Sequence, residues 1–342
     1  MSNKNKIDVV IPWVDGSDEN WIKEKNKYSY DISGEGVNNA RFRNWDTLKY
    51  TLRSIEEYMP WYNKIYLVTN GQIPTWLNLN NPKLELVNHK EYIPKEYTPT
   101  FNSHTIELNI HRIKKLSEKF IYFNDDYLIT NFMKKEEFFF HNLPCDSGIL
   151  NVHCPRKNRI IHTIAFNDTG IINEHFNIIA TLKNKKNWFN YKYGVKNIIQ
   201  NFILSKCPRF PGFKQFHTPN AYLKSTFEEV WDKEYGILNE TCMNKFRNKN
   251  DVNQWIMRNY QLSSNNFYPT KKCKETLLFD FENKDAENTL IDIEKALYNK
   301  NIKMICINDC DYLDDVELVV SKVKCLLEEK YPKTSSFEKR PK

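Results

Sequence analysis

The sequence predicts an α/β fold in which a mostly parallel sheet is flanked by helices. Short apolar runs that end in turn residues alternate along the chain with longer segments whose apolar residues recur at helical spacing. The 342 residues are 40% hydrophobic, which is enough for a substantial core. We therefore expect one domain over residues 1–327. The tail, 328–342, is polar and without apolar periodicity, and we expect it to be disordered.

The alternation is clearest in the first half of the chain. Residues 7–14 are a largely apolar run closed by Asp15 and Gly16, as expected of a buried strand followed by a tight turn. Residues 46–59 are predicted to be a helix, because their apolar side chains share one face and Pro60 follows. By the same criteria we predict strands over 64–69, 84–87 and 120–123, and a helix over 103–116.

The second half is less regular. Residues 148–206 are rich in aromatic side chains, and we expect a helical insertion there. We further predict helices over 214–235 and 252–260, a short strand over 304–307 and a final amphipathic helix over 314–327. Glycine occurs only nine times, with no GxGxxG or P-loop, which argues against NAD binding and Walker-type ATP chemistry.

Charge and hydropathy limit the environments that fit this chain. The formal net charge of +7 is scattered, and it suits either an ordinary soluble surface or attraction to phosphates. The start of the chain is polar, no apolar run approaches the ~20 residues that span a bilayer, and the eight cysteines form no CxxC pair. We expect a cytoplasmic protein with reduced thiols. Any contact with the membrane polysaccharide machinery would be peripheral, at the inner face.

Acidic side chains directly follow three of the predicted strands. They are Asp15 after the first, Asp125 and Asp126 after the strand at 120–123, and Asp309 after the late strand. Ligands of open α/β sheets bind beyond the carboxyl ends of strands, so these carboxylates would share one crevice if the strands are neighbours. Carboxylate and amide oxygens suit Mg²⁺ or Mn²⁺. The alternative is that each acid only starts a turn or caps a helix.

Several basic side chains are suited to bind phosphate. Arg41 and Arg43 precede the first predicted helix, and Arg247 lies late in the chain; the guanidinium fork matches phosphate oxygens. His217 can donate to phosphate or serve as acid or base near neutral pH. The alternatives are surface ion pairs for the arginines, which we favour for Arg53 with a nearby acid of its own helix, and a structural role for the histidine.

Four stretches resemble, in order, the conserved regions of the Stealth family. The first is 7–18, IDVVIPWVDGSD, and the second is 41–126, with RFRNWDTLKYTLRSIE near its start and KFIYFNDD at its end. The third is 214–262, with FHTPNAYLKSTFEEV, and the fourth is 303–314, KMICINDCDYLD. Together they cover about half of the chain. The family contains bacterial capsular polysaccharide phosphotransferases and the animal enzyme that marks lysosomal glycoproteins with N-acetylglucosamine-1-phosphate.

The resemblance implies one catalytic domain with a metal-dependent, GT-A-like and Rossmann-like core. It implies transfer of a hexose-1-phosphate from a UDP-sugar to a hydroxyl of a growing polysaccharide or lipid-linked glycan, with release of UMP. An ordinary metal-dependent glycosyltransferase releasing UDP is the main alternative, and a non-catalytic glycan-binding protein is a weaker one. Nucleic acid is not an expected partner, because no basic stripe or recognised motif occurs. The family often has an acid where this chain has Asn44, so we assign no catalytic role there.

The resemblance also implies roles for individual residues. Asp125, Asp126, His217 and Arg247 form the catalytic group, and Asp126 with Asp309 would hold Mg²⁺ or Mn²⁺. Which of the two adjacent aspartates is the base and which the metal ligand stays open. The positions assigned to substrate binding are Trp13, Asp15, Gly16, Arg41, Arg43, Asn70, Gly71, Asn102, His104 and Asn308.

Overall fold

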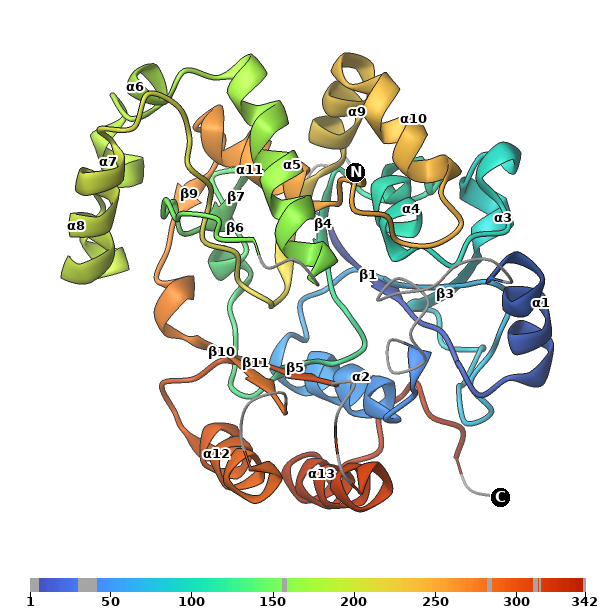
Figure 1. Cartoon of the computed structure of the whole chain (residues 1–342). Coiled ribbons are helices and arrows are strands. Elements are labelled where there is room, and N and C mark those ends of the chain that lie inside the picture. The colour runs from blue at the N-terminus through green and yellow to red at the C-terminus, as the bar shows by residue number, and fades with distance from the viewer. Residues whose placement is uncertain are drawn as a thin grey trace.

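A computed structural model describes residues 6–29, 42–155, 159–281, 285–309, 313 and 315–340. Its centre is a five-stranded sheet (Figure 1) with the order β3-β2-β1-β4-β8. The strands are β1 (Ile7–Pro12), β2 (Ile65–Thr69), β3 (Leu84–Asn88), β4 (Lys119–Tyr122) and β8 (Asn220–Leu223). All neighbours are parallel except β4 and β8, which are antiparallel. The predicted α/β fold with a mostly parallel sheet flanked by helices is confirmed.

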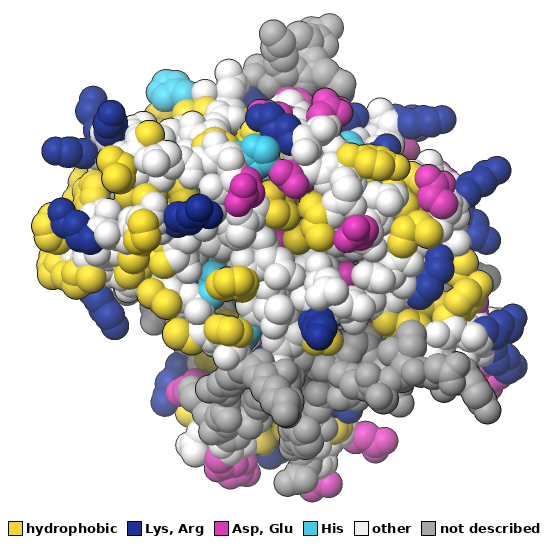
Figure 2. Space-filling model, turned by 45° about the horizontal axis from the view of Figure 1, so that its top comes forward, with side chains coloured by type: hydrophobic (Ala, Val, Ile, Leu, Met, Phe, Trp, Pro, Cys, Tyr) yellow, Lys and Arg dark blue, Asp and Glu magenta, His cyan; other side chains and the backbone are white. Residues whose placement is uncertain are grey.

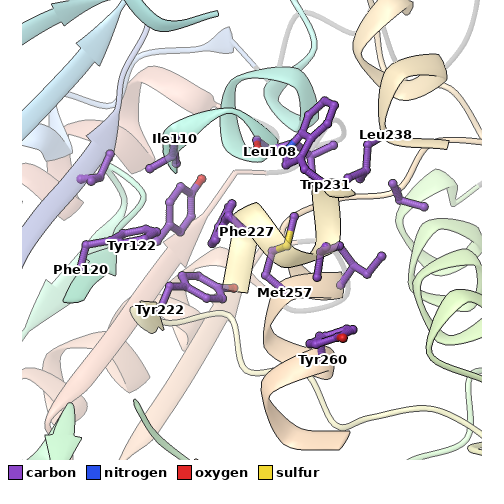
Figure 3. Packing of buried hydrophobic residues seen from close by; sticks show 14 of the residues in the cluster. Leu108, Ile110, Phe120, Tyr122, Tyr222, Phe227, Trp231, Leu238, Met257 and Tyr260 are labelled. Atoms are coloured by element: carbon purple, nitrogen blue, oxygen red, sulfur yellow. Dashed lines mark hydrogen bonds between the residues drawn. The ribbon is translucent and has the colours of Figure 1, made fainter. Parts of the chain in front are cut away.

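Both faces of this sheet are covered, which explains why its strands are mostly apolar on both sides. On one face Val9 and Ile11 pack with apolar side chains of α2 (Thr47–Tyr58). The opposite face packs against α9 (Lys224–Lys233) and α11 (Trp255–Ser263). Figure 3 shows this second core, where Phe120 and Tyr122 of β4 lie near Phe227 of α9. Successive side chains along each strand point to opposite faces of the sheet, so they pack in two separate cores.

A second sheet of three strands lies below the first in Figure 1, with the order β10-β11-β5. It contains β5 (Tyr127–Ile129), β10 (Thr276–Asp280) and β11 (Met304–Asn308), and β11 runs antiparallel to β5. Helices α12 (Ala286–Tyr298) and α13 (Val316–Lys330) cover its outer face, while α2 packs between the two sheets. The predicted late strand is thus not a neighbour of β1 or β4 in the main sheet.

The remaining elements surround these sheets. A small third sheet joins β6 (Phe139–Phe140), β7 (Leu143–Asp146) and β9 (Tyr268–Pro269). Further helices are α1 (Glu19–Ser29), α3 (His89–Tyr92), α4 (Ser103–Leu108), α5 (Ile160–His175), α6 (Ile178–Thr181), α7 (Lys185–Trp188), α8 (Val195–Leu204) and α10 (Tyr235–Met243). Short 3₁₀ turns occupy Lys95–Tyr97, Ile110–Arg112, Lys135–Glu137, Tyr191–Tyr193 and Lys272–Lys274. No helix in the described part of the chain has the length and apolarity needed to cross a bilayer.

Two helix predictions are partly wrong. The helix expected over 103–116 stops after Leu108, because the Asn109 side chain turns back to bind the carbonyl of Thr105 and a 3₁₀ turn follows. The helix expected over 214–235 begins only at Lys224, since residues 220–223 form β8. Strand β8 pairs with β4, whose edge would otherwise leave backbone groups unpaired. Such a partner cannot be seen in local periodicity.

The expectation of a disordered tail from Glu328 onward is also wrong. Helix α13 continues to Lys330, and the side chains of Tyr331 and Phe337 are fully buried. Arg53 donates to both Glu338 carboxylate oxygens at 2.8 and 2.9 Å. Its partner is therefore a tail residue, not an acid of its own helix. Single aromatic side chains, Tyr331 and Phe337, anchor the tail, so no periodic apolar pattern is needed to hold it in place.

Candidate active site

The antiparallel pairing of β4 and β8 brings together two segments that are far apart in the sequence. Tyr122 pairs with Asn220, so Asp125, three residues beyond β4, and His217, three residues before β8, lie past the same end of the strand pair. The ring of His217 packs edge-on against Tyr127 with centroids 5.9 Å apart. The acids that follow β4 and the predicted histidine are thus brought together.

The second sheet brings the late acidic segment to the same place. Cys306 of β11 pairs with Tyr127 of β5, and the next residue, Ile307, donates its backbone N–H to the carbonyl of Asp126. The Cys306 thiol lies 3.4 Å from Asp126 Oδ2. Strand β11 therefore ends beside the Asp125–Asp126 pair although it belongs to another sheet.

Asp309 is paired with a basic residue from the first half of the chain. The Arg43 guanidinium donates to Asp309 Oδ1 at 3.0 Å, with 32% and 15% of the two side chains exposed. Asn308, the last residue of β11, pairs across the sheet with Asp280. This geometry makes Arg43 a partner of the predicted metal ligand, which sequence reasoning did not foresee.

Arg247 lies in the loop between α10 and α11. Its guanidinium donates to Ser103 Oγ at 2.7 Å, at the beginning of α4. Burial lowers the pKa of His217 to about 4, and the positive charge of Arg247 acts in the same direction. Burial raises the pKa of Glu107, against the opposing charge of Arg247 and a hydrogen bond from Ser103. Arg247, His217 and Glu107 therefore share one electrostatic environment.

A hydrogen-bonded tyrosine connects Glu107 to Asn124, the residue that precedes Asp125. The Tyr122 hydroxyl lies 2.7 Å from Asn124 Oδ1 and 3.3 Å from Glu107 Oε1. Sequence reasoning missed Glu107, Ser103 and Cys306. For Glu107 a signal was available: it lies between the apolar residues Ile106 and Leu108 in a predicted core helix, and a buried carboxylate needs partners.

The two adjacent aspartates are electrostatically strained. Burial raises the pKa of both carboxyl groups, and the negative charge of Asp125 raises the pKa of Asp126 further. Asp126 Oδ1 is buried and finds no hydrogen-bond partner among the residues that the structure describes. Such a pair either keeps a proton or attracts a cation.

The acidic group suits a divalent cation only together with ligands from the substrate and water. Among the described residues, no three histidine, cysteine or acidic side chains are arranged to hold a metal ion by themselves. Mg²⁺ does not require such a group, because it is usually held by one or two carboxylates together with substrate phosphates and water. The unpartnered oxygen of Asp126 fits this mode of binding. Metal binding by Asp126 and Asp309 stays a prediction.

The turns after β1 and β2 form a second group. The Asp15 carboxylate accepts from the backbone and hydroxyl of Ser17 at 3.0 and 2.6 Å. Gln72 exchanges two hydrogen bonds with the Asp15 backbone, which ties this turn to the Asn70–Gly71 turn. Gly71 adopts a φ of 110°, which favours glycine. Trp13 is buried, and its backbone N–H pairs with Val68.

Phe42 and the next residue, Arg43, link the turn after β1 to the acidic group around Asp309. A Cβ atom at Gly16 would lie 1.9 Å from the Phe42 carbonyl oxygen, so no residue other than glycine fits there. The next residue, Arg43, pairs with Asp309. Segment 42–43 thus contacts the β1 turn with one residue and the acidic group with the other. Arg41, predicted to bind substrate, lies outside the described residues.

Asn102 and His104 contact the loop that carries Arg247 through Asp251. Both are buried, and Asn102 Nδ2 and His104 Nδ1 lie 2.8 and 3.2 Å from Asp251 Oδ2. Asp251 also accepts from Asn244 and from the backbone of Asn248. These bonds hold the loop that carries Arg247 against the beginning of α4. A fully buried Asn102 therefore acts on the site through this loop, and Asp251 was not anticipated from sequence.

Two conserved regions of one protein family match this chain. Stealth protein CR2, conserved region 2, matches residues 41–145. Stealth protein CR1, conserved region 1, matches residues 5–30. The matched segments include Asp15, Arg43, Asp125 and Asp126.

Relatives of similar length match nearly the whole chain. The capsular polysaccharide phosphotransferase WcwK of Streptococcus pneumoniae is 42% identical over 99% of this chain and 100% of its own length. The receptor polysaccharide phosphotransferase WefC of Streptococcus oralis is 36% identical over 98% and 99%. The exopolysaccharide phosphotransferase cps2G of Lactiplantibacillus plantarum is 38% identical over 97% and 96%.

A solved structure shares only a weak likeness with this chain. The apo-form glycosyltransferase GlyE of Streptococcus pneumoniae covers 86% of this chain and 73% of its own chain, at 12% identity and a TM-score of 0.24. At that score, no feature of one fold can be transferred to the other.

Proposed function

This chain belongs to the Stealth family of polysaccharide phosphotransferases, and we propose that it transfers a hexose-1-phosphate from a UDP-sugar to a polysaccharide hydroxyl, releasing UMP. The acceptor would be a growing capsular or other cell-surface polysaccharide, or its lipid-linked precursor. The observation that carries this proposal is the convergence of Asp125, Asp126, His217 and Arg247 from segments up to 122 residues apart. Carboxylates beside an arginine and a histidine suit phosphoryl transfer.

In the proposed reaction the acceptor oxygen attacks the β-phosphorus of the UDP-sugar. The bond from that phosphorus to the oxygen bridging to the α-phosphate breaks, and UMP leaves with the bridging oxygen. The hydroxyl proton passes to a carboxylate. Arg247 suits the oxygens of the transferring phosphoryl group, because its fork binds two of them at once.

We assign the proton acceptor to Asp125 and the metal position to Asp126. The raised pKa of Asp125 makes it a better base near neutral pH than an exposed aspartate. Asp126 has the unpartnered oxygen and lies beside the end of β11, which leads to Asp309. A divalent cation bound there would neutralise charge on the diphosphate.

His217 is neutral at pH 7, because its pKa is lowered to about 4. It therefore serves the reaction as a neutral hydrogen-bond donor to a phosphate oxygen. The group around Asp15, Gly16, Asn70 and Gly71 would face the uridine end. Asn70 Oδ1 is buried without a hydrogen-bond partner in the described structure, so it can accept a bond from a ligand.

The test is to identify the nucleotide product. The protein is incubated with a panel of UDP-sugars, Mg²⁺ and capsule fragments, and the nucleotide is separated by chromatography while ³¹P NMR follows the glycan. We expect UMP and a new phosphodiester signal in the glycan, and neither in the presence of a chelator. Release of UDP with no phosphorus in the glycan would instead identify a glycosyltransferase.

A further inference from the structure

Helix α8 presents its apolar face to solvent. Val195, Ile199, Phe202 and Ile203 are 73, 53, 60 and 61% exposed. Their spacing of i, i+4, i+7 and i+8 places them on one face of the helix. An amphipathic helix of a globular protein normally turns this face toward the core, so the orientation of α8 is the reverse of the usual one.

Polar side chains hold the helix in this orientation. The buried residue of α8 is Asn201, which accepts from the Leu150 backbone at 2.7 Å and donates to the Gly148 carbonyl at 2.8 Å. Gln200 donates to the Leu150 carbonyl at 2.7 Å. Rotating the helix to bury its apolar face would break these bonds and leave buried polar groups unpaired. The outward apolar face is therefore built into the fold.

The apolar face lies in a strongly basic part of the chain. Residues 175–227 contain no aspartate or glutamate. They contain nine basic residues: Lys183, Lys185, Lys186, Lys192, Lys196, Lys206, Arg209, Lys214 and Lys224. Figure 2 shows hydrophobic side chains gathered at the left of the molecule, on the side of α7 and α8 in Figure 1, with Lys and Arg side chains around them. The Lys206 ammonium lies 5.2 Å from the centre of the Phe202 ring.

Neighbouring segments extend the same kind of surface. Ile179 on α6 is 63% exposed, and Tyr191, in the turn just before α8, is 80% exposed. The exposed lysines at 183, 185 and 186 lie between them in sequence. Exposed aliphatic side chains, an aromatic side chain and lysines with no acid nearby in sequence form the pattern of an interfacial membrane-binding surface.

We infer that α8, with Ile179 and Tyr191, docks the enzyme on an anionic lipid bilayer. The apolar face of α8 enters the boundary between headgroups and acyl chains, and the lysines contact anionic headgroups. The helix has ten residues, so it lies on the membrane and does not span it. A second copy of this chain fits the surface poorly, because two lysine-rich surfaces would repel each other.

Docking through this surface would place the proposed reaction at the membrane. If the acceptor is a glycan on a lipid carrier, docking brings the enzyme to the membrane that holds it. That consequence rests on the proposed function, whereas the docking itself does not.

Vesicle flotation of the full chain tests the docking. The vesicles contain phosphatidylcholine alone or phosphatidylcholine with phosphatidylglycerol. We expect the protein to float with the anionic vesicles, and about 0.5 M salt to weaken the binding. Replacing Ile199, Phe202 and Ile203 by serine should lower the bound fraction about tenfold, since it removes most of the inserted apolar surface.

Two further variants make the test specific. Lys185→Glu with Lys186→Glu and Lys196→Glu should also abolish flotation while leaving the apolar face intact. Ile291→Ser with Leu318→Ser removes apolar side chains of 46 and 53% exposure from α12 and α13, and it should float like the wild type. Circular dichroism verifies that each variant is folded.

Three outcomes would overturn the inference. They are a wild type that does not float, a serine triple variant that floats as well as the wild type, or equal flotation with neutral vesicles. A wild-type dimer in light scattering that the serine variant converts to monomer would assign the face to self-association. Transfer to soluble capsule fragments should be unchanged in the serine variant. Absence of transfer in the wild type would count against the proposed function and leave the docking result valid.

Discussion

At the scale of single residues, burial shifts the pKa values of the ionisable side chains in the site. Asp125 and Asp126 have a raised pKa, because burial disfavours ionisation of both carboxyl groups and the charge of Asp125 further disfavours ionisation of Asp126. His217 has a lowered pKa for the same reason of burial. A phosphate-bearing substrate and a cation would supply the charges that these groups lack. The free site is therefore electrostatically incomplete, as expected of a site that gains stability when its ligands bind.

Replacing Asp126 by Asn tests this residue directly. We expect turnover to fall on the order of 10³-fold, because the amide keeps the shape of the side chain but loses the charge that attracts the cation. Stability should not fall, since a strained buried charge is removed. Steady-state kinetics and thermal unfolding measure the two effects.

Asp232→Asn is the matched control, because Asp232 is an exposed acid on α9. It should leave both turnover and unfolding temperature unchanged. Turnover near the wild-type level in a folded Asp126→Asn variant would remove Asp126 from the mechanism.

At the scale of elements, loops reach the site only because other elements hold them. The loop that carries Arg247 has no regular structure, and Asp251 ties it to Asn102 at the beginning of α4. Strand β8 is placed by β4, and it in turn places His217. Residues that would not contact the substrate, such as Asp251 and the β4–β8 pair, thus fix the positions of residues that would contact it.

Asn102→Ala should reduce activity although Asn102 is fully buried. The change leaves the Asp251 carboxylate with fewer partners and loosens the Arg247 loop. We expect about 1–3 kcal/mol lower unfolding free energy and roughly tenfold lower turnover. Asn177→Ala is the control, because Asn177 caps α6, far from this loop in sequence, and accepts from Ala180. Equal kinetics in the two variants would contradict a positioning role for Asn102.

The packing of α9 on the sheet predicts a pH dependence of stability. His111 is buried with ring centroids 5.8 and 6.0 Å from Phe227 and Trp231 of α9. Burial lowers its pKa to about 3, from an unfolded value near 6.5. Between these values the unfolded chain binds more protons than the native one, so stability falls as the pH falls.

His111→Gln should flatten this dependence. Urea unfolding from neutral pH to about pH 4.5 should show the wild type losing up to about 1.4 kcal/mol per pH unit more than the variant. Because His89 is also buried with a lowered pKa, both proteins keep its contribution, and the difference isolates His111. Parallel curves for the two proteins would mean that His111 does not titrate in this way.

At the scale of the whole molecule, two sheets and a C-terminal segment form one packed structure. Helix α2 lies between the sheets, and Arg53 on it binds Glu328, Glu338 and the Tyr331 carbonyl. Phe337 is buried with Tyr62 and residues of the main sheet. The end of the described chain thus stabilises the helix on which both sheets pack.

Phe337→Ala should destabilise the entire domain. Loss of a fully buried phenylalanine costs about 3–5 kcal/mol, and urea unfolding should show that loss in a single transition. Phe132→Ala, at a phenylalanine that is 54% exposed, is the control and should change stability little. A small effect of Phe337→Ala would show that the tail is dispensable.

The sequence alone determined the strands β1, β2, β3, β4 and β11, because each is a short, largely apolar run closed by a turn residue. It also determined the acids that follow β1, β4 and β11. Side-chain chemistry marked His217 and Arg247 as possible phosphate-binding residues, and the resemblance to the family assigned them to the catalytic group. These strands could be predicted from local pattern, because a strand buried on both faces must consist mainly of consecutive apolar residues.

Only the tertiary structure decided which of these segments meet. It placed β11 in a second sheet, antiparallel to β5, so that Asp309 approaches the Asp125 segment by a route that a single parallel sheet would not provide. It also paired β8 with β4, Arg43 with Asp309 and Asp251 with Asn102. These pairings join residues far apart in sequence, and their free energy depends on desolvation and geometry that exist only once the chain has folded.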